Sequence, residues 1–194
     1  RYPEGAVREG CPQERNSMAE QIAHTKNEKI EQFGRICFYA GLLLELLIVI
    51  LDKSSWINPL EGQMFRVSFL LFACKLCVTK YSKKEWLAVL AAGVIAGLWY
   101  LSSGRDEAVR VVVFVASMKG IDHKKALRVV FYVTLTGMAV LAMLSLAGVL
   151  GEVWDAGAGY GIKEGSRRLC LGVGNSNALA IMIWALMTLG VYLF

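Results

Sequence analysis

Charged side chains are scarce in this sequence of 194 residues, of which 19% are Asp, Glu, Lys or Arg. Hydrophobic residues make up 56% of the chain, and the mean hydropathy is +0.48. This composition is too apolar for an ordinary soluble domain of the same size. The low charge content therefore argues against a soluble enzyme and predicts a protein of the lipid bilayer.

Several motifs that mark enzyme classes are also missing. The sequence contains no nucleophile elbow, P-loop, dinucleotide-binding glycine pattern or cluster with metal-ligand spacing, so we expect no metal and no cofactor. At least three of the five cysteines fall inside apolar segments, which argues against a disulfide framework. The net charge of +5 comes from short clusters between apolar runs, so no nucleic-acid partner is expected.

The sequence instead contains six apolar stretches, at 36–51, 64–79, 86–101, 108–118, 127–150 and 178–194. Four of them approach or reach the length that crosses roughly 30 Å of hydrocarbon as a helix. The fourth stretch is short and is expected to be tilted or re-entrant. The pattern predicts an all-α, polytopic transmembrane helical bundle of about six spans over residues 36–194.

Lysine and arginine indicate how these spans are oriented. They concentrate in two loops and before the first span, at Lys80, Lys83, Lys84, Lys119, Lys124, Lys125, Arg128, Lys26, Lys29 and Arg35. The positive-inside rule places these segments, and with them the N-terminus, in the cytoplasm. The loops at 52–63, 102–107 and 151–177 are then predicted to lie outside.

The two ends of the sequence differ from the rest. Residues 1–35 are polar and are predicted to form a flexible N-terminal segment, within which Met18 is the expected native start. At the other end the sequence stops at Phe194 within an apolar run, so we expect the protein to be truncated there.

Arginines are the main candidates for binding a substrate. Five lie on the predicted outer side, namely Arg66, Arg105, Arg110, Arg167 and Arg168. The guanidinium fork matches phosphate oxygens and does not lose its charge, so these residues suit an anionic substrate such as a diphosphate. An equally simple interpretation is that they reach lipid headgroups or pair with Asp106, Glu107 and Glu164.

Other polar residues stand near or inside the spans. Gly172 and Gly174 permit a sharp turn, and Asn175, Ser176 and Asn177 are N-cap candidates for the last span. A helix N-terminus favours an anion, although capping alone explains the pattern as well. Glu45 and Lys75 lie within apolar stretches. Each could belong to a proton or substrate path. The alternatives are a buried polar partner for Glu45 and, for Lys75, a side chain that extends to the membrane surface.

Three motifs in order, WINPLEGQMFR at 56–66, SSGRDEAVRVVVFVASMKGID at 102–122 and RRLCLGVGNSNALAIMIWAL at 167–186, resemble the N-terminal half of the bacterial capsular-polysaccharide and O-antigen polymerase and ligase family. Relatives have an arginine, a Leu-Gly-x-Gly turn and then His-Pro-Asn. This sequence matches at Arg167 or Arg168 and at Leu171, Gly172, Gly174 and Asn177, whereas Asn175 and Ser176 replace the expected His and Pro.

The resemblance implies a metal-independent glycosyltransferase in the bacterial cytoplasmic membrane. Such an enzyme joins oligosaccharide repeat units carried on undecaprenyl diphosphate at the outer face, beside other membrane proteins of polysaccharide assembly. Its diphosphate contacts are expected at Arg105, Arg167 and Arg168, then at Arg66, Arg110, Asn175 and Asn177, and no catalytic base is identified. The alternatives are a transporter or flippase of lipid-linked sugars and a non-catalytic membrane protein remnant.

Overall fold

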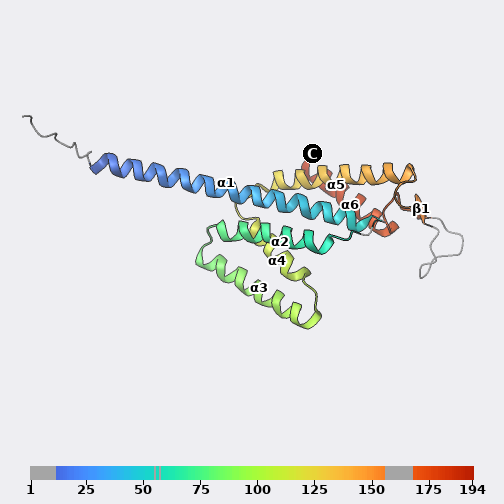
Figure 1. Ribbon diagram of the computed structural model, residues 1–194, viewed down its shortest axis with the longest axis horizontal. Helices are drawn as coiled ribbons and strands as arrows, with labels where there is room; N and C mark the ends of the chain where they lie inside the picture. Colours follow the sequence, from blue (N-terminus) through green and yellow to red (C-terminus); the bar gives the residue numbers. More distant parts are fainter. Residues whose placement is uncertain (1–11, 55, 57, 156–167) are drawn as a thin grey trace, which may run out of the picture.

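The computed structural model describes residues 12–54, 56, 58–155 and 168–194, and most of these are helical (Figure 1). This confirms the predicted all-α class. The two strands are two residues long and pair with each other in antiparallel register. In chain order the elements are α1 (Pro12–Lys53), α2 (Glu61–Val78), α3 (Lys83–Ser103), α4 (Glu107–Ser117), α5 (His123–Leu146), β1 (Trp154–Asp155), β2 (Arg168–Leu169) and α6 (Ser176–Leu193).

Helix α1 is longer than its apolar stretch and extends beyond the other helices at its N-terminal end (Figure 1). Its 42 residues correspond to about 63 Å at 1.5 Å per residue. Residues 12–35 belong to the segment 1–35 that was expected to be flexible and polar, and they are helical and continuous with the first span. The remainder of that segment lies outside the described residues. Pro12 suits the first helical position, where its missing N–H costs no hydrogen bond.

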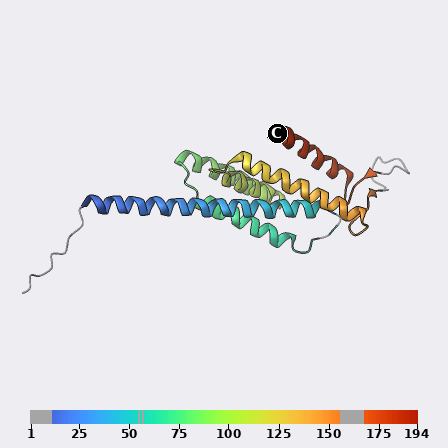
Figure 2. The ribbon, with the colours of Figure 1, turned by 90° about the horizontal axis from the view of Figure 1, so that it is seen from above.

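Four helical segments are long and apolar enough to cross a bilayer, at His24–Lys53, Lys83–Ser103, His123–Leu146 and Ser176–Leu193. The protein is therefore a polytopic membrane protein, but six spans are not shown. Helix α4 has 11 residues, which is roughly half the length that the hydrocarbon core requires. Helix α2 contains Glu61, Arg66 and Lys75 and packs along α1 (Figure 2).

Successive helices run in opposite directions, so the loops gather at two ends of the bundle (Figures 1 and 2). At one end the lysine-rich loops meet, since Lys80 contacts Asn27 of α1 and Lys119 pairs with Glu85 of α3. We call this the lysine-rich end. At the opposite end the Gly174 N–H donates to the Lys53 carbonyl over 2.9 Å, which ties the end of α1 to the segment before α6.

Small residues and aromatic rings hold the helices together. A Cβ atom on Gly41 of α1 would lie 3.0 Å from the ring of Phe72, so the absent side chain leaves room for α2. The rings of Phe38, Phe72 and Phe114 pack against one another at centroid distances of 5.2 to 6.1 Å. Close packing around small residues is a main source of helix association in lipid, and here it joins α1, α2 and α4.

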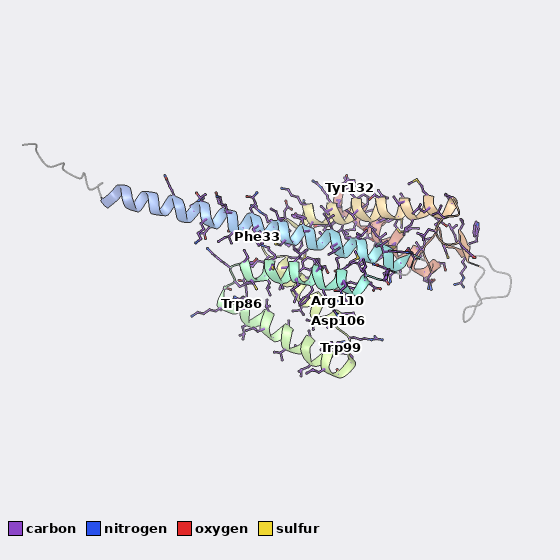
Figure 3. The ribbon with its side chains drawn as sticks, in the orientation of Figure 1. Phe33, Trp86, Trp99, Asp106, Arg110 and Tyr132 are labelled. Carbon is purple, nitrogen blue, oxygen red and sulfur yellow. The ribbon has the colours of Figure 1, made fainter. Side chains whose placement is uncertain are left out.

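The outward surfaces of the helices are apolar, as expected for contact with lipid. Most side chains of α3 are exposed, among them Leu87, Ile95 and Leu98. Trp86 and Trp99 lie near the two ends of this helix (Figure 3), about 20 Å apart along its axis by residue count. Exposed tryptophans at both ends of an apolar helix match the two interfaces of a bilayer.

Candidate functional site

The candidate site consists of two neighbouring cavities in the half of the bundle away from the lysine-rich end. The first, about 450 Å³ in volume, lies between α1, α2, α4 and α5 and is called the Glu45 cavity. The second, about 780 Å³, lies between α2, α3 and α4 and is called the Arg66 cavity. Phe65, Phe69 and Arg110 line both cavities, so the two spaces are separated by these side chains.

Arg110 occupies the boundary between the cavities. Its guanidinium lies over the ring of Phe65, with Cζ 4.2 Å from the ring centroid, and Nη2 is 3.4 Å from Oδ1 of Asp106. Figure 3 labels Arg110 and Asp106 near the start of α4. Cation–π and ionic contacts of this kind hold an arginine in a defined orientation. The side chain is 25% exposed, so a ligand in either cavity can reach it.

The Nε atom of Arg110 is buried and has no hydrogen-bond partner among the described residues. A buried donor without a partner costs roughly 1 to 3 kcal/mol, and such groups in native proteins call for a specific explanation. An anion that accepts from the guanidinium would remove this cost.

The first turns of two helices also line the Arg66 cavity. Glu61 and Gly62 begin α2, and Asp106 is the N-cap of α4. Neither N-terminus is capped by a side-chain hydrogen bond. In α2 the N–H groups of Glu61 and Gln63 donate to the carbonyls of Asn58 and Leu60, so the N–H groups available to a ligand are that of Gly62 and those in the first turn of α4. Helix N-termini carry partial positive charge and favour anions, which adds to the charge of Arg66 and Arg110.

Carboxylates are present beside these cationic groups. Glu61 and Asp106 line the Arg66 cavity, and Glu45 and Glu107 line the Glu45 cavity. The site is therefore not a uniformly basic surface, since it combines two guanidinium groups with four carboxylates. This mixture suits a ligand that has both anionic oxygens and neutral hydroxyl groups.

Glu45 has a defined partner inside the bundle. Ser68 Oγ donates to Glu45 Oε2 over 2.7 Å, and the Ser68 side chain is 1% exposed. The bond crosses from α2 to α1. Of the two interpretations of Glu45, the structure shows the buried partner, and it also places the carboxylate at the wall of a cavity.

The structure brings together two of the predicted site residues. Arg66 and Arg110 line the Arg66 cavity, whereas Arg105 and Arg168 are exposed and are not among its described lining residues. Arg168 lies in β2, opposite Asp155. Arg167 lies outside the described residues, so its place in the site stays a prediction.

Asn175 and Asn177 form the start of α6. The side-chain oxygen of Asn175 accepts from the Asn177 N–H over 2.8 Å, which confirms the predicted N-cap. Before it, Leu171 and Gly172 both have positive φ, 48° and 78°, in a turn closed by the Val173 N–H to the Cys170 carbonyl. Two successive positive φ values are typical of a type I′ turn. The capping interpretation thus has direct structural support.

The sequence analysis did not identify Ser68, Tyr100 or the phenylalanines Phe65 and Phe69 as lining residues of the cavities. Tyr100, at the end of an apolar stretch, lines the Arg66 cavity. Phe65 and Phe69 have no distinguishing sequence signal, since aromatic residues are equally expected on a lipid-facing surface. The pairing of Glu45 with Ser68 had a weak signal, because an ionisable group inside a span usually has a polar partner.

Comparison with known proteins adds no assignment. No family model, curated protein or solved structure matches this chain. The family resemblance noted from the three motifs therefore stays a prediction, and any function has to be argued from the cavities themselves.

Proposed function

We propose that the protein binds a polyprenyl-diphosphate-linked oligosaccharide in the paired cavities and takes part in glycosyl transfer as a membrane-embedded polysaccharide polymerase. The observation that supports this most strongly is that Arg66, Arg110 and two uncapped helix N-termini line one cavity. Undecaprenyl diphosphate is the carrier that the sequence resemblance implies. We expect its diphosphate to bind in the Arg66 cavity.

The ligand's other parts also fit the surroundings. The diphosphate oxygens would accept hydrogen bonds from Arg66, from Arg110 and from first-turn N–H groups of α2 and α4. The apolar prenyl chain would leave the cavity along the exposed hydrophobic surface beside Leu70, which lines the Arg66 cavity and is 61% exposed. Carboxylates accept hydrogen bonds from sugar hydroxyl groups, which accounts for the acidic residues nearby.

The proposed reaction is a displacement at the anomeric carbon. An acceptor hydroxyl forms the new C–O bond, the bond to the diphosphate breaks, and its electron pair stays on the diphosphate oxygen. Arg66 and Arg110 would stabilise the charge that develops there. The hydroxyl proton would pass to a carboxylate, for which we propose Glu45, since Ser68 holds it at the cavity wall.

We further propose that the cavities face the outside of a bacterial cytoplasmic membrane. The lysine-rich end contains the loops with Lys80 and Lys119, and the positive-inside rule places such an end in the cytoplasm. The N-terminus would then be cytoplasmic. Other membrane proteins of polysaccharide assembly are the proposed partners, because repeat units have to be delivered to the outer face.

Binding of undecaprenyl diphosphate to the full chain in lipid nanodiscs tests this proposal. We expect the variants Arg66→Gln and Arg110→Gln to bind at least tenfold more weakly, because each loses charge-assisted hydrogen bonds worth more than about 1.4 kcal/mol. Arg128→Gln is the matched control, since Arg128 is exposed on α5. Equal affinity of all three variants and the unmodified protein would refute the proposal.

A further inference from the structure

A third cavity lies at the lysine-rich end, where the proposed function does not use it. It has a volume of about 240 Å³ and lies between α1, α2 and the loop after α4; we call it the Lys75 pocket. Among its described lining residues, Glu31 provides the one carboxylate. Four cationic side chains line it as well, those of Arg35, Lys75, Lys80 and Lys119. The pocket therefore has an excess of positive charge.

Lys75 is the central cation of this pocket. The residue as a whole is 6% exposed, and it lines the pocket. The aliphatic stem lies against α1 at Gly34, where an added Cβ would be 3.1 Å from Lys75 Cδ and 3.6 Å from Nζ. The missing side chain at Gly34 thus gives the lysine its place between the helices.

The ammonium of Lys75 makes no hydrogen bond or ion pair with any described residue. Glu31 likewise forms no ion pair with the cations of the pocket within the described part of the chain. Glu31 still acts on Lys75 through its charge, but one carboxylate does not balance the four cations of the pocket. Cations near low dielectric are normally paired, so the uncompensated positive charge of the pocket points to an anion that comes from outside the chain.

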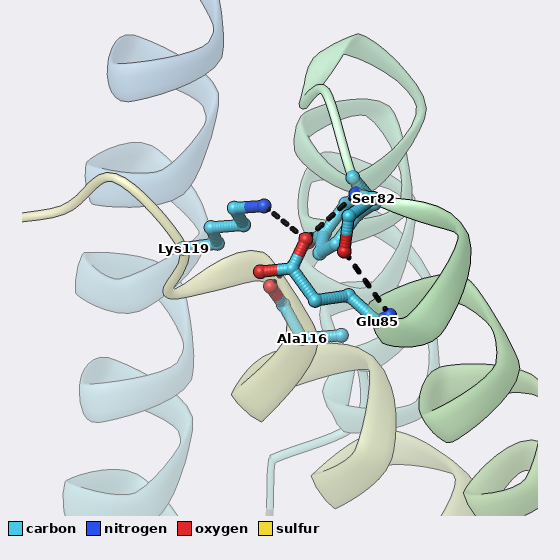
Figure 4. Close-up of polar contacts among 5 residues, drawn as sticks. Ser82, Glu85, Ala116 and Lys119 are labelled. Atoms are coloured by element: carbon cyan, nitrogen blue, oxygen red, sulfur yellow. Dashed lines mark hydrogen bonds and ion pairs between the residues drawn. The ribbon is translucent and has the colours of Figure 1, made fainter.

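The cations at the rim are already held in position. Lys119 Nζ is 2.5 Å from Glu85 Oε2 and 4.8 Å from the ring centroid of Tyr81, and Glu85 also accepts from the Ser82 N–H (Figure 4). Lys80 Nζ donates to Asn27 Oδ1 over 3.3 Å. Fixing these side chains in advance lowers the entropy that a ligand would have to overcome.

We propose that the Lys75 pocket binds a phosphate group, whose oxygens accept hydrogen bonds from the Lys75 ammonium. Phosphate oxygens accept several hydrogen bonds at once, which suits an ammonium that faces a pocket also lined by Arg35, Lys80 and Lys119. Basic pockets between membrane helices bind the headgroups of acidic lipids. Free phosphate has the same chemistry, so the experiment has to separate the two sources.

Two measurements on the full chain in detergent make that separation. Native mass spectrometry records retention of phosphatidylglycerol against phosphatidylcholine, and thermal unfolding compares inorganic phosphate with chloride at equal ionic strength. Retention of phosphatidylglycerol without a phosphate effect identifies a lipid headgroup. Stabilisation by inorganic phosphate without a lipid preference identifies the free anion. If neither effect is seen, the proposal is overturned.

Variants locate the effect. Lys75→Met keeps the apolar stem and removes the charge. Arg35→Gln changes an exposed residue at the rim of the pocket. If one variant fails to fold, the other still tests the proposal. We expect each variant to need at least a tenfold higher concentration of phosphatidylglycerol for the same retention, or of phosphate for the same shift in melting temperature. The control is Lys84→Met, an exposed lysine outside the described pocket lining. Equal binding by the unmodified protein and both pocket variants would overturn the proposal.

Discussion

Ser68 and Glu45 form a hydrogen bond between two helices, with Ser68 Oγ 2.7 Å from Glu45 Oε2. The bond lies beside the cavity that Arg110 also lines. It therefore links the packing of α1 and α2 to the position of a carboxylate in the candidate site.

Replacing Ser68 with Ala should destabilise the protein by about 1 kcal/mol, which is the usual size of a hydrogen bond between membrane helices. Thermal unfolding in detergent measures the effect. Ser102→Ala is the control, because Ser102 bonds only to Trp99 within α3 among the described contacts. A melting temperature equally unaffected by both changes would contradict the structural role of this bond.

The close approach of α1 and α2 at Gly41 leads to a second prediction. Gly41→Leu should weaken the pair by about 1 to 3 kcal/mol, because the new side chain would overlap Phe72. Gly93→Leu in α3 is the matched control, since no atom lies within 4 Å of an added Cβ there. Chemical unfolding of both variants in detergent compares them. A Gly41 variant as stable as the Gly93 variant would show that the helices are not packed in this way.

The N-cap of α6 leads to a third prediction. Asn175→Ala should cost about 1 kcal/mol of stability, whereas Asn175→Asp should cost little because aspartate also caps helices well. Since Asn175 is not among the described lining residues of the Arg66 cavity, Asn175→Asp should bind undecaprenyl diphosphate normally. Weaker binding by the Asp variant, with unchanged stability, would assign Asn175 to the substrate instead.

A fourth prediction concerns alkaline pH. Tyr81 Oη donates to the Ala116 carbonyl over 2.5 Å, and burial raises the pKa of this phenol. A folded-state pKa above the unfolded value means that the contribution to stability is complete below the unfolded pKa, about 10, and is lost as pH rises through the folded value. Tyr81→Phe should thus lower the melting temperature equally between pH 6 and 9. A difference that changes across that range would contradict the assignment.

The sequence was sufficient to predict the class of the fold. The apolar stretches identify the six helices of the described residues, because burial in lipid leaves a strong hydropathy signal. The lysine clusters indicate which loops share an end. Periodicity does not show that α1 continues back to Pro12. That region contains few apolar residues, and its helix depends on propensity and on continuity with the span.

The candidate site was less predictable, and the reason is geometric. Arginines near the outer ends of different helices look equivalent in the sequence, yet Arg66 and Arg110 share a cavity while Arg105 and Arg168 are exposed elsewhere. Which of them meet depends on how α2 and α4 pack, and that depends on contacts such as the edge-to-face contact of Phe72 with Phe114. Residue type alone does not contain this information.

The central claim, that Arg66 and Arg110 bind one diphosphate, is tested most directly by a double-mutant cycle. The affinity of undecaprenyl diphosphate would be measured in nanodiscs for Arg66→Gln, Arg110→Gln and the double variant. Because both guanidinium groups line the same cavity, we predict that the losses are not additive and differ from their sum by about 0.5 kcal/mol or more. Additive losses would mean that the arginines act at separate places, which would contradict the account.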